Sequence, residues 1–172
     1  MQAITDIKHL TVQTLPPILV LTGEDVGQFE WLKKDILNKI GYDPSDLNYS
    51  YFDMKEASYA EVELDLVSLP FFADEKIVIL DHLLDLTTAK KRNLTDEDLK
   101  QFENYLENPS ESTRLVIFAE GKLDSKRRLV KLLKRDAQII EATTPKEQEV
   151  KRYFASQAQE LGLQFEGDSL DQ

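Results

Sequence analysis

Residues 18–41, ILVLTGEDVGQFEWLKKDILNKIG, contain the change of periodicity that decides the fold. Ile18–Thr22 is a continuous apolar run, which is typical of a strand buried on both faces of a sheet. From Asp25 onward the apolar residues recur at helical spacing instead, and Gly41 stands where a C′ glycine would end the helix. The residues on this helical face are Phe29, Leu32, Ile36 and Ile40. A buried strand followed directly by an amphipathic helix predicts one unit of a parallel sheet.

The same alternation continues along the chain. Short apolar or Tyr-rich runs predict further strands, and capping residues followed by apolar positions at helical spacing predict further helices. The expected strands are residues 18–22, 47–53, 77–80, 114–119 and 138–141. The expected helices open near Asp25, Ser58, Thr95 and Ser125. The prediction is an α/β fold of three layers around a mainly parallel, five-stranded sheet.

A shift in composition marks an expected domain boundary after residue 142. Thr144 as N-cap, Pro145 in the first helical position and Glu147 three residues after the cap predict a new, strongly charged helix. We therefore expect an α/β domain over residues 1–142 and the beginning of a helical second domain over 143–172. The second domain is too short to be whole, so the sequence is expected to be part of a longer protein.

The overall composition narrows the functional classes. The 172 residues contain 21 Lys and Arg against 32 Asp and Glu, so the net charge is -11. Tight DNA binding by this chain alone is disfavoured, because an acidic surface repels a phosphate backbone. Cys is absent, which excludes disulfides and thiolate chemistry and favours a cytoplasmic protein. No signal peptide or membrane-spanning run is evident, so no membrane contact is expected.

The loop after the first strand is where a parallel α/β protein would bind phosphate. A P-loop requires G-x-x-x-x-G-K-[ST], with Lys at the terminal phosphates and the hydroxyl on magnesium. Here Gly23 and Gly27 are one residue too close, Gln28 replaces the Lys and Phe29 replaces the hydroxyl. We therefore predict a degenerate phosphate loop and no cofactor. The alternative is a nucleotide-handling α/β enzyme with an unrecognised phosphate site.

No catalytic or metal-binding residues are predicted elsewhere. The only histidines are His9 and His82, which leaves little material for a nucleophilic triad or a His-rich metal site. Asp81 stands where a P-loop protein would keep its magnesium-organising acid, but the favoured interpretation of Asp81 and His82 is a solvated strand end. A metal cluster of Asp81, His82 and Asp85 is the weaker alternative.

The segment Leu69-Pro70-Phe71-Phe72 is an apolar cluster at a junction between a helix and a strand. Such junctions usually lie on the surface. Pro70 stiffens the segment and lowers the entropy lost on docking. Two interpretations are open from the residues alone: the phenylalanines fold back under the sheet, or they point outward as anchors for a protein partner.

Residues 122–135 are basic at seven of fourteen positions, within an otherwise acidic chain. The simpler interpretation is the solvated face of an amphipathic helix whose leucines enter the core. The alternative is a docking face for DNA phosphates or for an acidic subunit. The candidate contacts are Lys126, Arg127, Arg128 and Lys131.

Three stretches together resemble the delta subunit of the bacterial DNA polymerase III clamp loader, in its Gram-positive form. They are TGEDVG at 22–27, SLPFFADEKIVI at 68–79 and LVIFAEGKLD at 115–124, the last followed by the basic helix. The resemblance covers the whole chain as the family's N-terminal part. It implies a fold like that of AAA+ and P-loop NTPase domains, with a degenerate nucleotide site.

The resemblance also implies a function without catalysis. In this family the apolar cluster enters a pocket of the sliding clamp, the beta subunit, and helps to open the ring for loading onto primed DNA. Carried over here, Leu69, Pro70, Phe71 and Phe72 form the clamp-binding element and are expected to point outward. The implied partners are the clamp, primed DNA within the complex, and other loader subunits held by a C-terminal domain beyond Gln172.

Overall fold

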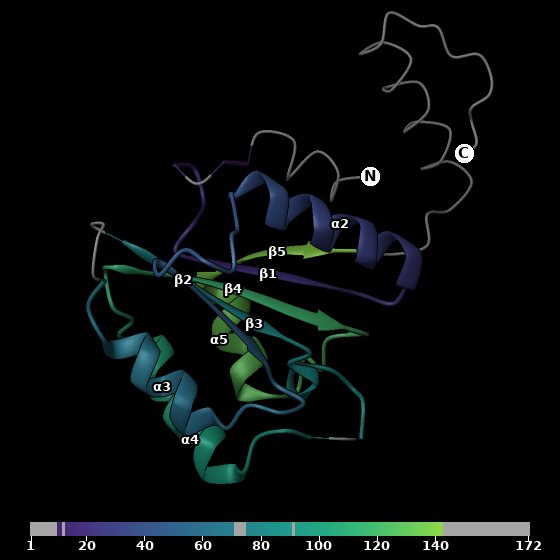
Figure 1. The fold of residues 1–172 in the computed structure, drawn as a ribbon. Coiled ribbons are helices and arrows are strands. Elements are labelled where there is room, and N and C mark those ends of the chain that lie inside the picture. The colour runs from purple at the N-terminus through teal and green to yellow at the C-terminus, as the bar shows by residue number, and fades with distance from the viewer. Residues whose placement is uncertain (1–9, 12, 71–74, 91, 143–172) are drawn as a thin grey trace, which may run out of the picture.

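The computed structural model describes residues 10–11, 13–70, 75–90 and 92–142. Helices and strands alternate along these ranges (Figure 1). The elements are, in chain order, β1 (Ile18–Gly23), α2 (Val26–Lys39), β2 (Tyr49–Asp53), α3 (Tyr59–Val67), β3 (Lys76–Asp81), the 3-10 turn η1 (Leu84–Leu86), α4 (Asp96–Glu107), β4 (Thr113–Glu120), α5 (Arg128–Asp136) and β5 (Gln138–Glu141). The expected helical domain over 143–172 lies outside the described residues.

The described strands form one five-stranded sheet in the order β2-β3-β4-β1-β5, and every neighbouring pair is parallel. Strand β1 pairs with β4 from Ile18 opposite Leu115, and with β5 from Leu19 opposite Gln138. The predicted α/β fold with a five-stranded parallel sheet is therefore confirmed. Because β1 lies between the last two strands of the chain, the loop that follows it is flanked by the carboxyl ends of β4 and β5.

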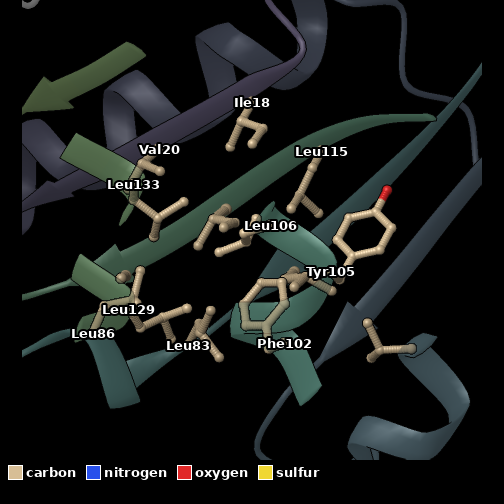
Figure 2. Close-up of a cluster of buried hydrophobic side chains, with 14 of the residues drawn as sticks. Ile18, Val20, Leu83, Leu86, Phe102, Tyr105, Leu106, Leu115, Leu129 and Leu133 are labelled. Carbon is tan, nitrogen blue, oxygen red and sulfur yellow. The ribbon is translucent and has the colours of Figure 1, made fainter. Parts of the chain in front are cut away.

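Helices cover both faces of this sheet, which explains why its central strands are continuously apolar. One face packs against α3, α4 and α5. Figure 2 shows Ile18 and Val20 of β1 on the side of Leu106 of α4 and Leu133 of α5 in this layer. The opposite face, with Leu19 and Leu21 of β1, packs against α2. Figure 1 shows the two helical layers on either side of the sheet.

The predicted helix ends are largely confirmed. Asp25 caps α2 by accepting the Gln28 N–H at 3.0 Å, and Gly41 has a φ of 72° at its C-terminal end. Ser58 forms a capping box with Glu61. Thr95 caps α4 and forms a capping box with Asp98 in the same way. These local bonds satisfy N–H groups that a helix leaves unpaired.

Two predicted boundaries were wrong by a few residues, in each case because an aspartate stabilises a turn. Helix α5 begins at Arg128 rather than at Ser125, since the Asp124 carboxylate accepts the backbone N–H of Lys126 at 3.1 Å. Strand β2 begins at Tyr49, since Asp46 accepts the Asn48 N–H at 2.9 Å in the same manner. Local Asx turns of this kind compete with regular structure.

Candidate functional site

The loop after β1 is bonded to the strands beside it. Gly23 has a φ of 129°, and its N–H donates to the Gly121 carbonyl at 2.9 Å. The Gly121 N–H donates back to the Gly23 carbonyl at 2.7 Å, which forms an antiparallel bridge between the two loops. The Thr22 hydroxyl donates to the same Gly121 carbonyl at 2.9 Å. The start of the degenerate phosphate loop is thus joined to the end of β4.

The end of β5 closes the loop from the other side. The Ala142 N–H donates to the Thr22 carbonyl at 2.7 Å, and the Ala142 carbonyl accepts the Asp25 N–H at 3.3 Å. A Cβ placed on Gly23 would lie 1.9 Å from this Ala142 carbonyl oxygen. Protein backbone therefore occupies the space directly beside Gly23, and glycine is required there by close approach as well as by its positive φ.

The start of α2 carries its own anion. The Asp25 carboxylate accepts the Gln28 N–H, at the helix end where phosphate is usually bound. In this arrangement the N–H groups of Gly23, Asp25 and Gln28 all donate to protein oxygens. Gly27 lies in the first turn of α2, and a Cβ placed on it would lie 3.7 Å from an Asp25 carboxylate oxygen. Three N–H groups of this loop thus donate to protein oxygens, and one of the acceptors is a carboxylate, which would repel a phosphate.

Asp81 is buried at the end of β3, so the interpretation of this residue as a solvated strand end was wrong. Its side chain is 4% exposed, and Oδ2 lies 2.5 Å from Nζ of Lys33 on α2. The Tyr51 hydroxyl donates to the same carboxylate oxygen, and the His82 N–H donates to Oδ1 at 2.8 Å. An acid that occupies the position of a magnesium ligand is here neutralised by an internal ammonium group.

His82 and Asp85, the other two members of the possible metal cluster, are each bonded to other groups. His82, at a φ of 60°, places Nδ1 2.9 Å from the Asp53 carboxylate. Burial and the hydrogen bond to Asp81 raise the pKa of Tyr51 well above its ordinary value. Asp85 is fully buried and accepts the backbone N–H groups of residues 93 and 94. In the described ranges no three His, Asp or Glu side chains are placed to hold a metal ion.

The basic helix is amphipathic as predicted, with Leu129 and Leu133 in the core. Its arginines are paired with nearby acids: Arg128 lies 2.9 Å from Glu107, and Arg127 lies 3.4 Å from Asp124. Lys126 and Lys131 are exposed, and neither ammonium group forms an ion pair with a described residue. The structure therefore separates the four candidate contacts into two neutralised arginines and two lysines available to a partner.

The junction between α3 and β3 presents Leu69 to solvent, with 76% of its surface exposed. Pro70 is half-buried. Phe71 and Phe72 lie outside the described residues, so their predicted orientation stays a prediction. Leu69, the first residue of the proposed clamp-binding element, therefore lies on the surface.

A buried lysine fastens the helical side of this junction. Lys76, the first residue of β3, is 5% exposed, and its Nζ donates to the Asp65 carbonyl and, at 2.6 Å, to the Ser68 hydroxyl. The Thr113 hydroxyl of β4 donates to the Leu66 carbonyl at 3.1 Å. Carbonyls of the last turn of α3 are thus bonded from the sheet, and the ammonium group complements the negative end of the helix dipole.

Sequence reasoning missed Lys33 and Lys76. A signal existed for Lys33, because it falls four residues after Phe29 and three before Ile36, within the apolar stripe of α2. A charge on a core-facing stripe predicts a buried partner. Lys76 carried no such signal, since a lysine before an apolar strand is ordinarily a solvated strand start.

The fold and comparisons with known proteins together define the class of protein. The α/β domain is similar to the solved Bacillus subtilis DNA clamp loader delta protein, with a TM-score of 0.73 at 23% identity over 93% of this chain and 47% of that one. It also resembles a DNA polymerase III gamma subunit-related protein of Thermotoga maritima, with a TM-score of 0.51 at 16% identity over 94% and 53% of the two chains. The fold is that of the AAA+-like domains of clamp loaders.

The sequence model described as "DNA polymerase III, delta subunit" matches residues 19–143, and the chain belongs to this family. The curated DNA polymerase III subunit delta of Bacillus subtilis (strain 168) is 27% identical over 141 residues, which cover 78% of this chain and 40% of that protein. The chain thus spans less than half the length of this relative. The resemblance predicted from the sequence is confirmed.

Proposed function

We propose that this chain binds the sliding clamp through Leu69, Pro70, Phe71 and Phe72, and that it helps to open the ring for loading onto primed DNA. One observation carries the proposal. In a chain of the delta family, the first residue of the apolar element is 76% exposed, next to a helix end that is bonded to the sheet. A helix end that is bonded to the sheet and is followed by an exposed apolar side chain suits insertion into a preformed pocket.

The opening of a ring requires no catalytic residue in this chain. A ligand that binds the open form of the clamp more tightly than the closed form shifts the equilibrium by that difference in affinity. Two observations support a subunit that is itself non-catalytic and takes no nucleotide cofactor. The loop after β1 is hydrogen-bonded to neighbouring backbone, and Asp81 forms an ion pair with Lys33. In this proposal, other loader subunits bind and hydrolyse ATP, and the complex works in the cytoplasm.

Titration of the chain into the sliding clamp of the same organism tests the proposal. The double substitution Phe71→Ala/Phe72→Ala should weaken binding by about a hundredfold or more. Burial of each phenylalanine contributes roughly 1.5–3 kcal/mol, and each 1.4 kcal/mol is about tenfold in affinity. Isothermal calorimetry, with folding checked by circular dichroism, is the measurement.

The matched control is Trp31→Ala, which removes an aromatic side chain that is 54% exposed on α2, a different element. This variant should bind the clamp as the unmodified chain does. Equal binding by the double phenylalanine variant and the unmodified chain would refute the site. Saturable binding of ATP with magnesium would instead favour the alternative function, a nucleotide-handling enzyme with an unrecognised phosphate site.

A second proposal concerns primed DNA within the assembled loader. It rests on Lys126 and Lys131, the two candidate contacts whose ammonium groups form no ion pair with a described residue. Substitution of both by Ala should lower the affinity of the loader for primed DNA. It should also reduce the slope of log K against log salt by about one for each phosphate that the variant no longer neutralises. Fluorescence anisotropy over a series of salt concentrations measures both effects.

Arg128→Ala is the control for this pair, because its guanidinium already lies 2.9 Å from Glu107 and 3.5 Å from Glu103. Arg128→Ala should change the salt slope less than the double lysine substitution does. An unchanged slope in the double lysine variant would leave this helix as the solvated face predicted by its amphipathic pattern.

A further inference from the structure

Helix α3 carries apolar side chains on two opposite sides. Its inward side packs Tyr59, Val62 and Leu66 into the core, and all three are at most 2% exposed. Its outward side carries Leu64 and Val67, which are 72% and 58% exposed. These two residues are three positions apart and therefore neighbours on one helical face. A surface helix normally places polar residues there.

The exposed apolar side chains of the described residues are concentrated in this region. The large hydrophobic residues that are exposed are Val26, Trp31, Leu47, Leu64, Val67 and Leu69. Three of the six fall within residues 64–69, whereas the others lie on α2 and in the loop before β2. Single exposed hydrophobic residues are ordinary, but a gathering of them marks an interaction surface. We call Leu64, Val67 and Leu69 the α3 stripe.

The α3 stripe is held outward by the structure around it. The inward side of the helix is already filled by its core residues, so a rotation that buried Leu64 would expose them. Figure 1 shows α3 beside α4, on the face of the sheet opposite α2. The capping box of Ser58 fixes the first turn. Lys76 and Thr113 bond the carbonyls of the last turn. The surface is therefore preorganised and loses little conformational entropy on docking.

We infer that the clamp contact begins on α3, so that Leu64 and Val67 bind the sliding clamp together with Leu69. This inference rests on the proposed function, which it extends from the junction to the helix before it. The clamp is the expected partner because the α3 stripe adjoins the proposed clamp-binding element. Leu69 belongs to both and follows Val67 by two residues.

Charge beside the stripe defines the chemistry of the surface that receives it. Glu61 is exposed and Glu63 is partly exposed, and they precede Leu64 on the helix by three residues and by one. The complementary surface on the clamp is then an apolar floor with basic residues at its rim. Complementary charges at a rim contribute mainly to association rate and specificity, whereas the apolar contacts contribute most of the affinity.

The test compares two surface variants of the full chain in the same clamp titration. Leu64→Gln/Val67→Gln keeps good helix-forming residues on α3 and alters no buried side chain, so folding should be retained. We expect its affinity for the clamp to fall by about tenfold or more. The control is Leu47→Gln, which removes a similarly exposed leucine outside the stripe and should leave the affinity unchanged.

The outcomes separate this inference from the proposed function. If Phe71→Ala/Phe72→Ala weakens clamp binding but Leu64→Gln/Val67→Gln does not, the clamp contact stops at the junction and the inference is wrong, while the proposed function stands. If no clamp binding is seen for the unmodified chain, both fail. Sedimentation velocity adds a separate outcome: self-association that disappears in the α3 variant would assign the stripe to a second copy of this chain and overturn the inference.

Discussion

Substitution of Asp81 by Asn is expected to lower the free energy of unfolding by about 3–5 kcal/mol, since it leaves the Lys33 ammonium group without its counter-charge in a largely buried position. The side chains of the pair are 14% and 4% exposed, so water replaces little of the missing interaction. The neutral amide can still accept the Tyr51 hydroxyl, which isolates the effect of charge. Chemical denaturation followed by circular dichroism measures the change.

The matched control uses a pair on the same helix. Lys39 and Asp35 lie 2.9 Å apart at i, i+4 and are 28% and 23% exposed. Asp35→Asn should cost only about 0.3–0.5 kcal/mol. A second comparison replaces Lys33 by Met together with Asp81 by Leu, which should recover much of the stability because both charges are then removed. A cost below about 1 kcal/mol for Asp81→Asn, the value typical of exposed pairs, would show that the pair is more hydrated than the structure indicates.

Substitution of Gly23 by Ala is expected to destabilise the protein by about 2–6 kcal/mol, as the sum of two effects. A φ of 129° is unfavourable for any residue with a Cβ, at a cost of about 1–3 kcal/mol. The new methyl group would also lie 1.9 Å from the Ala142 carbonyl oxygen, and to separate these atoms by moving β1 or β5 costs about 1–3 kcal/mol more. Thermal unfolding of the purified variant gives the measurement.

Gly27→Ala is the matched control, because it alters the other glycine of the degenerate phosphate loop. Gly27 lies in the first turn of α2, and the nearest atom to an added Cβ is a carboxylate oxygen of Asp25 at 3.7 Å. This substitution should be neutral or should stabilise the protein by up to about 1 kcal/mol, as glycine is a poor helix former. Similar destabilisation by both substitutions would contradict the assigned role of Gly23.

Most of the fold could be predicted because its determinants are local in the sequence. The apolar run at Ile18, the capping residues Ser58 and Thr95, and Gly41 after the helix all act within a few residues of their position. Each one specifies an element type or an element end, and strict strand-helix alternation then leaves a parallel sheet as the main solution. The strand order required the structure, since pairing joins residues far apart in the chain.

The site could be predicted only in part, because its fixing contacts are tertiary. The exposed position of Leu69 could be expected from its place at a junction between a helix and a strand. The contact of the Lys76 ammonium group with the end of α3 joins two elements, and no local sequence pattern predicts it. Asp81 was taken for a solvated acid because its partner Lys33 lies 48 positions away on another element. The orientation of Phe71 and Phe72 remains a prediction from the family resemblance.

The hydrogen bonds between Gly23 and Gly121 bear on whether this domain could act as a switch. A molecular switch needs two conformations that a ligand distinguishes by affinity. Here the loop after β1 is joined by backbone bonds to the ends of β4 and β5, so a second conformation of the loop would have to break these bonds. Under the proposed function, this domain would therefore be equally ready to bind the clamp before and after other subunits hydrolyse ATP. Control of clamp binding in time would then come from those other subunits.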